Sequence, residues 1–113
     1  MVKNLLLAAL AISALFVLMA APAFADGNPH VAEAIAHAEE AAKHGGMGHA
    51  DAVVGHAQEA LSHAEMAQKD VKNPHLDEGV SELKEAIAHG GQGHAEVATK
   101  HAKSAVMHLK EVH

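Results

Sequence analysis

The stretch NPHVAEAIAHAEEAAKHGGMGH, residues 28–49, recurs 45 residues later as NPHLDEGVSELKEAIAHGGQGH, residues 73–94. When the chain is shifted by this distance, residues 28–64 align with 73–109 without a gap and with 16 identities in 37 positions. A repeat of this length indicates that one supersecondary unit has been duplicated.

Each unit has the pattern of two helices joined by a tight turn. Asn28 and Asn73 are suited to cap a helix, and each precedes a proline at the first helical position. Alanine and glutamate, which favour helix, fill the interior. The sequences Gly45-Gly46-Met47-Gly48 and Gly90-Gly91-Gln92-Gly93 are predicted to end the first helix of each unit. We therefore predict four helices, at 29–44, 50–70, 74–89 and 95–112.

The predicted fold class is all-α, an antiparallel up-down four-helix bundle made of two repeated helical hairpins. Apolar residues recur three and four positions apart in every predicted helix, and the short turns favour antiparallel neighbours. The positions expected at the centre of the apolar stripes are Val31, Ala38, Ala50, Ala57, Leu76, Leu83, Ala95 and Ala102.

The first 25 residues have the layout of a signal peptide. Lys3 precedes the uncharged run 5–21, and Ala23-Phe24-Ala25 supplies small residues for cleavage. We expect residues 1–25 to be removed on export to the periplasm and residues 26–113 to form the His-rich four-helix bundle domain. An uncleaved membrane anchor is the less favoured alternative, since the apolar run is nearly long enough to span a bilayer.

The composition of residues 26–113 suits cations. This part has 7 Lys, no Arg and 14 Asp and Glu, so its formal charge is 7 − 14 = −7. Such a surface argues against nucleic-acid binding. Without cysteine, no disulfide stabilises the small core, and a metal ion could do so instead. We expect a monomer with no membrane contact after cleavage.

All 12 histidines lie in this part of the chain, and 11 of them follow steps of seven residues along the predicted helices or from the residue just before one. Glu82 stands at one such position, and His113 ends the chain. Seven helical residues rise about 10.5 Å, so two histidines of one stripe cannot share an ion. Glutamates three or four residues away and histidines of the neighbouring helix must complete each site. If each hairpin folds symmetrically about its glycine turn, His44 faces His49 in the first unit and Glu82 faces His101 in the second.

This arrangement predicts up to six metal sites, three per hairpin. The predicted ligands are His30, His37, His44, His49, His56, His63, His75, His89, His94, His101 and His108, with Glu33, Glu40, Glu59, Glu78, Glu82 and Glu85. A single surface histidine is usually only solvated, but a seven-residue period reproduced across a duplication indicates ligands. Imidazole with carboxylate favours Cu(II), and Ni(II), Zn(II) and Co(II) are the other candidates.

Three segments resemble the periplasmic small metal-binding protein family: HVAEAIAHAEEA at 30–41, KHGGMGH at 43–49 and GHAEVATKHA at 93–102. The likeness covers nearly all of residues 26–113. It implies a four-helix bundle that binds several divalent ions, copper above all, in metal storage or tolerance. Glu82 departs from the histidine repeat.

The sequence therefore predicts sequestration of several divalent transition metals in the periplasm, and no enzymatic activity, because no paired acid and base and no nucleophile stand out. The alternative is a pH-responsive structural or chaperone-like helical protein of the periplasm, because protonation of 12 histidines would change the formal charge from −7 to +5.

Overall fold

The computed structural model describes residues 27–113, which form four α-helices and contain no β-strand. The helices are α2 (Pro29–Gly46), α3 (Ala50–Gln68), α4 (Pro74–Gly91) and α5 (Ala95–Lys110). The prediction of an all-helical chain with four helices is confirmed. The predicted signal peptide lies outside the described residues. None of the four helices has both the length and the apolar character that crossing a membrane requires.

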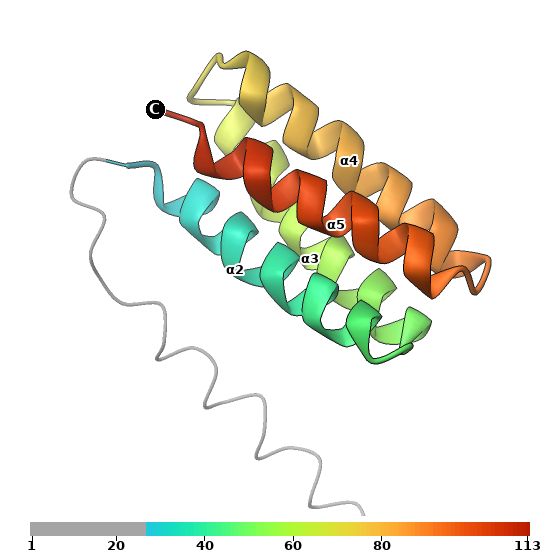
Figure 1. Cartoon of the computed structure of the whole chain (residues 1–113). Helices are drawn as coiled ribbons and strands as arrows, with labels where there is room; N and C mark the ends of the chain where they lie inside the picture. The colour runs from blue at the N-terminus through green and yellow to red at the C-terminus, as the bar shows by residue number, and fades with distance from the viewer. Residues whose placement is uncertain (1–26) are drawn as a thin grey trace, which may run out of the picture.

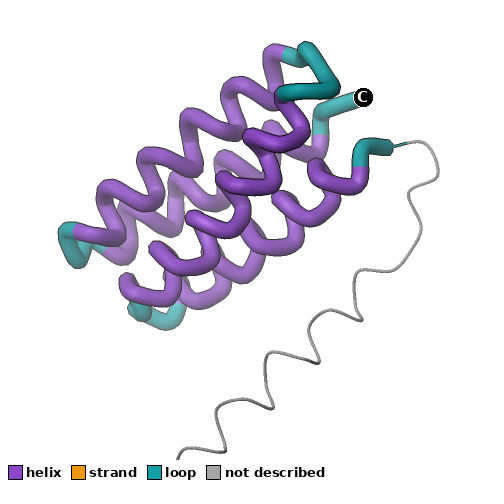
Figure 2. Tube along the Cα trace, turned by 180° about the vertical axis from the view of Figure 1, so that it is seen from behind, coloured by secondary structure: helices purple, strands orange, loops and turns teal. Residues whose placement is uncertain are grey.

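The four helices lie lengthwise beside one another in a bundle (Figure 1). Each packs mainly against two neighbours, in the cyclic order α2, α3, α4, α5. The loops gather at the two ends of the bundle (Figure 2). The start of α2, the C-terminus and the loop between α3 and α4 share one end, and the two glycine turns share the other (Figure 1).

Asparagine caps begin the first helix of each unit. The side chain of Asn28 accepts a hydrogen bond from the backbone N–H of His30 at 2.8 Å, and Asn73 accepts one from His75 at the same distance. Each bond satisfies one of the N–H groups that a helix start leaves without a partner. The predicted caps are confirmed, and each fixes the backbone of the first histidine of its stripe.

The glycine turns end α2 and α4 two residues later than predicted. Gly45 and Gly46 are still helical, and the chain leaves the helix at Gly48, whose φ is +82°. There the N–H of His49 bonds to the carbonyl of His44, and the N–H of Gly48 bonds to that of Gly45. This is a Schellman motif, which requires the left-handed conformation only at its penultimate residue. The glycine pair therefore remains within the helix.

The bundle interior is built from small residues in the first unit and larger ones in the second. Alanine accounts for most buried positions of α2 and α3, where Val31 and Val53 are the larger exceptions. Most of the largest fully buried side chains belong to α4 and α5: Leu76, Leu83 and Leu109. Large residues of one unit thus pack with small residues of the other in a common core. Of the predicted central positions, Ala50 and Ala95 are only partly buried.

One glycine of the first turn is needed for close packing. A Cβ at Gly45 would overlap the hydroxyl of Thr99 and lie 3.0 Å from its Cβ and 3.1 Å from Cγ2 of Val53. Thr99 is itself buried and donates its hydroxyl to the carbonyl of Ala95 at 2.6 Å, so it cannot turn aside freely. The absence of a side chain at Gly45 therefore sets the distance between the end of α2 and α5.

This contact predicts opposite effects for two neighbouring alanine substitutions. Gly45→Ala should lower the thermal unfolding temperature, because the new methyl group forces Thr99 and the α2–α5 contact apart. Gly46→Ala, with nothing within 4 Å of the added Cβ, should stabilise the protein by about 0.5–1 kcal/mol through helix propensity. Thermal unfolding followed by circular dichroism measures both. A Gly45→Ala protein as stable as Gly46→Ala would contradict the packing described.

Candidate metal centres

The histidines of the first unit form a continuous zigzag of neighbouring rings between α2 and α3. The ring centroids are 5.5 Å apart for His30 and His63, 5.7 Å for His63 and His37, 6.3 Å for His37 and His56, 5.0 Å for His56 and His44, and 5.9 Å for His44 and His49. We call this row of side chains, with its counterpart in the second unit, the histidine ladder.

The zigzag follows from the direction of helical side chains. Every Cα–Cβ bond of a helix tilts toward the N-terminus of that helix. His37 therefore leans toward the level of His30, against which His63 lies, while His63 leans toward the level of His56. The two side chains thus lean toward each other, although neither is the directly facing partner of the other.

The second unit repeats the ladder with one interruption. His75 and His108 stack at 5.5 Å, His101 and His89 at 5.3 Å, and His89 and His94 lie 6.1 Å apart. Between them Glu82 takes the place that His37 has in the first unit, and its Oε1 lies 2.7 Å from Nδ1 of His101. The contact predicted between Glu82 and His101 is therefore present.

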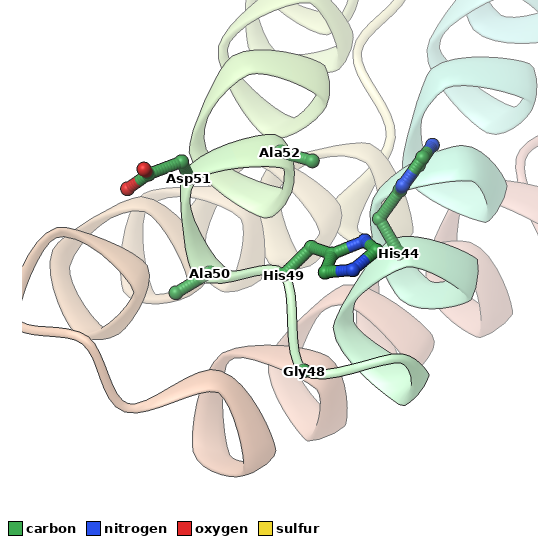
Figure 3. A pocket seen from close by; sticks show the side chains of 6 residues that line it. All are labelled: His44, Gly48, His49, Ala50, Asp51 and Ala52. Carbon is green, nitrogen blue, oxygen red and sulfur yellow. The ribbon is translucent and has the colours of Figure 1, made fainter.

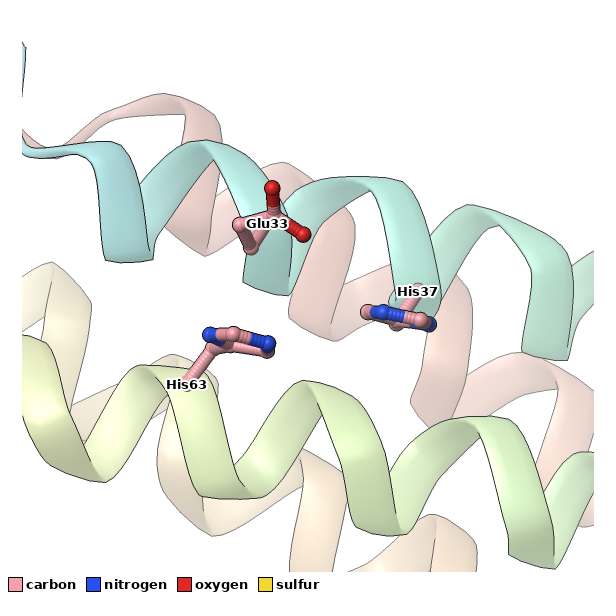
Figure 4. A group of neighbouring side chains, drawn as sticks. All are labelled: Glu33, His37 and His63. Atoms are coloured by element: carbon pink, nitrogen blue, oxygen red, sulfur yellow. The ribbon is translucent and has the colours of Figure 1, made fainter. Parts of the chain in front are cut away.

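Three groups of side chains bring three ligand atoms within 4.8 Å of one another. They are Glu33 with His37 and His63, Glu40 with His44 and His56, and Glu85 with His89 and His101. In each group α2 or α4 supplies a glutamate and the histidine four residues later, and the next helix supplies the other histidine. Figure 4 shows the first group, with His37 and His63 in the space between α2 and α3.

The geometry of these groups fits a transition-metal ion. Ligand atoms that bind one ion at about 2.0–2.2 Å lie roughly 3–4 Å from one another. The atoms of each group, already within 4.8 Å of one another, are close to this spacing. In two of the groups Nδ1 of His44 and of His89 is buried and has no hydrogen-bond partner among the described residues. A buried polar atom of this kind calls for an ion or an ordered water, and an imidazole lone pair suits the former.

The groups differ from the predicted metal sites, which combined directly facing residues. Ring contacts do join the facing pairs, such as His44 with His49 and His37 with His56. The three-ligand groups, however, combine histidines one step apart, as His37 does with His63, and within residues 27–113 there are three of them and not six. The tilt of the side chains is the physical reason, and it could have been applied to the sequence.

The remaining predicted ligands border these groups. Nδ1 of His30 lies 3.2 Å from Nδ1 of His63, and the same atoms of His75 and His108 are 3.3 Å apart. Glu59 Oε1 is 3.2 Å from Nδ1 of His37. Separately, Glu78 Oε1 is 3.8 Å from Nε2 of His108. His49 and His94 are exposed at the glycine turns.

The turn of the first unit also forms an open pocket. It is lined by His44, Gly48, His49 and residues 50–52. The rings of His44 and His49 lie on one side of it, and the carboxylate of Asp51 points away from them (Figure 3). This pocket leads from solvent to the end of the histidine ladder.

The ladder disfavours protonation of two central rings. Burial, together with the nearby His44 and His37, lowers the pKa of His56 below its ordinary value of 6.5, against an opposing effect of Glu40. Burial also lowers the pKa of His63, with His37 and His30 acting in the same direction and Glu33 opposing them. These rings are therefore neutral at neutral pH, as metal ligands must be.

The comparisons with known proteins agree with this geometry. No curated protein matches the chain. A family model described as "Small metal-binding protein" matches residues 3–112, which is nearly the entire chain. The residues that converge in three His–His–Glu groups thus occur in a sequence of that type, and the chain belongs to the small metal-binding protein family.

Proposed function

We propose that this protein binds several divalent transition-metal ions at the three His–His–Glu groups of the ladder and stores or sequesters them in metal homeostasis or tolerance. The observation that carries this proposal is the convergence of two imidazoles and one carboxylate within 4.8 Å at each group. The other ladder histidines, with Glu59 and Glu78, would act as auxiliary donors.

The proposed sites depend on the relative direction of the helices, for which we propose an up-down bundle with antiparallel neighbours. The ring contacts support this arrangement. From His30 to His44 the residue numbers rise along α2, while the contacting residues of α3 fall from His63 to His49. The short turns at residues 47–49 and 92–94 support it as well.

Copper(II) is the ion that we expect to bind most tightly. Affinities of nitrogen and oxygen sites for divalent ions rise to Cu(II) and fall at zinc. The absence of cysteine removes the thiolates that would favour Cu(I). Ni(II), Zn(II) and Co(II) fit the same donor set more weakly. We propose binding and not catalysis, because residues 26–113 contain no cysteine nucleophile and no Phe, Tyr or Trp that could line a substrate pocket.

We also propose that the protein acts in the periplasm. The support is the sequence of residues 1–25, with its charged start, apolar run and small-residue cleavage site. Export would leave residues 26–113 as a soluble monomeric metal-binding domain. Elemental analysis of the protein purified from native periplasm would identify the ion that it carries.

The number of groups predicts the number of ions. We expect the mature protein to bind three Cu(II) ions at micromolar affinity or better, and His63→Ala to bind one fewer, since His63 belongs to the first group alone. Isothermal titration calorimetry with elemental analysis measures both. His113→Ala is the matched control, because this exposed histidine belongs to none of the groups. Equal loss in both variants, or fewer than two ions in the parent protein, would refute the proposal.

Bound metal should also stabilise the bundle. An ion that binds only the folded state adds about 2.7 kcal/mol when its free concentration is 100 times the dissociation constant. We expect the unfolding temperature to rise with Cu(II) or Zn(II) and to return after chelation, as scanning calorimetry can show. Magnesium is the control ion, because it prefers oxygen ligands. An equal rise with magnesium would mean that the ladder does not bind through imidazole.

The lowered pKa values of His56 and His63 predict how acid acts on the metal-free protein. Because each folded-state pKa lies below the unfolded value of 6.5, the folded state binds fewer protons. Stability is therefore full above about pH 6.5 and falls as the pH drops through the lowered pKa values. NMR titration of the ring protons and urea unfolding at several pH values measure the two effects.

Metal release should accompany this loss, since protons compete for the same nitrogens. Cu(II) affinity is expected to fall steeply below about pH 6. Acid unfolding without any effect of metal at neutral pH would instead support the pH-responsive structural alternative.

A further inference from the structure

The two units differ at one position of the ladder. Glu82 stands where the repeat has His37, 45 residues earlier. Its Oε1 lies 2.7 Å from Nδ1 of His101, and the side chains of Glu82 and His101 are only 25% and 29% exposed. This is the shortest of the His–Glu contacts between the described residues, whose other distances range from 3.2 to 3.9 Å.

The contact specifies the tautomer of His101. An ionised carboxylate has no proton to give, so Nδ1 of His101 must be the donor. A neutral ring with its proton on Nδ1 has its lone pair on Nε2. His101 belongs to the group with Glu85 and His89, so Nε2 is the atom left to coordinate an ion there. A carboxylate that accepts the other ring N–H of a ligand histidine fixes the orientation of the ring and raises its basicity.

The presence of glutamate and not histidine at position 82 also removes a ligand from a second position of the ladder. In the first unit His37 joins Glu33 and His63 in a three-ligand group. Their counterparts in the second unit are Glu78, Glu82 and His108, which form no such group among the described residues. His108 contacts His75 instead, at 3.3 Å between the Nδ1 atoms.

We propose that Glu82 is a positioning residue: its carboxylate holds His101 with Nδ1 protonated and Nε2 directed to the metal ion shared with Glu85 and His89, and the second unit has one metal site fewer as a result. The two units therefore differ in the number of metal ions that they can hold. The first has two sites with three ligands each, and the second has one site whose histidine is oriented by a further carboxylate. This inference rests on the proposed function and adds a division of roles within it.

The first test needs no metal. The ¹⁵N chemical shifts of the His101 ring in the metal-free protein at pH 8 report which nitrogen carries the proton. We expect the Nδ1–H form in the parent protein, the same form in Glu82→Gln, which retains an acceptor oxygen, and a change toward Nε2–H in Glu82→Ala. An unchanged tautomer in Glu82→Ala would overturn the assignment of Glu82.

The second test measures each site separately by titrating Zn(II) into the full mature protein and following the histidine resonances by NMR. Glu82→Ala should weaken zinc binding at His89 and His101 by about 10–100-fold, the usual effect of losing an outer carboxylate, with a smaller loss in Glu82→Gln. Binding at His44 and His63 is the internal reference, because general destabilisation of the bundle would weaken all three sites together. Glu65→Ala, which removes an exposed carboxylate of α3, controls for net charge.

The outcomes separate the two proposals. Weakening of all sites alike, or none at His101, refutes the role of Glu82 while metal binding stands. No response of any histidine to zinc in the parent protein refutes the metal-binding function itself, and with it the role of Glu82.

A gain of one ion provides the third test. Glu82→His restores the repeat and should form a fourth three-ligand group with Glu78 and His108, so the number of zinc ions bound should rise from three to four. Circular dichroism confirms that the variant folds. A folded variant that still binds three ions would show that Glu82 does not account for the difference between the units.

Discussion

The close approach of the alanine-lined helices α2 and α3 is the constraint on which the ladder of the first unit depends. Ala38, Ala57 and Ala64 are fully buried between α2, α3 and their neighbours, and none is large enough to hold the helices apart. At this separation imidazoles on the edge of the interface stack at 5.0–6.3 Å between centroids. Larger residues along the α2–α3 interface would widen the gap and separate the ligands. The small interior residues therefore determine both how the helices pack and how far apart the ligands lie.

The four helices and the row of ligands could be predicted from the sequence, because the signals for them lie within short segments of the chain. Helix propensity, the asparagine caps and the seven-residue histidine period each depend on residues close in the chain, and they give the four helices and the stripe of ligands. The need for glycine at position 45 could not be predicted, since it depends on close contact with Thr99 of α5, which is distant in the sequence. The pairing of His37 with His63 follows from the tilt of both side chains toward the N-termini of their helices, which the prediction of directly facing pairs did not include.

Both units consist of two helices joined by a glycine turn, but their side chains have different roles. The first unit has small interior residues and the longer row of imidazoles, whereas the second supplies Leu76, Leu83 and Leu109 to the common core. Glu82 extends this difference to the ladder. A carboxylate at that position forms a charge-assisted hydrogen bond to His101 without any ion, so the second unit does not depend on metal to order that ring.

The ladder lies beside the core and not inside it. This position affects both the affinity of the proposed sites for a metal ion and the ease with which the ion could leave. Full burial would lower the pKa values of the rings further and would isolate a divalent ion from water at a large cost in free energy. Full exposure would leave the rings solvated and mobile. Partial burial, as in the 12% exposed side chain of His37, restricts the orientation of the rings, while the glutamate of each group remains near solvent. One carboxylate at each proposed site would offset half the charge of a divalent ion, and the remaining acidic residues of 26–113, whose formal charge is −7 in total, would offset the rest. On the proposed function, an ion held in this way would bind without unfolding the bundle, and it would leave when protons or a stronger ligand compete for the imidazoles.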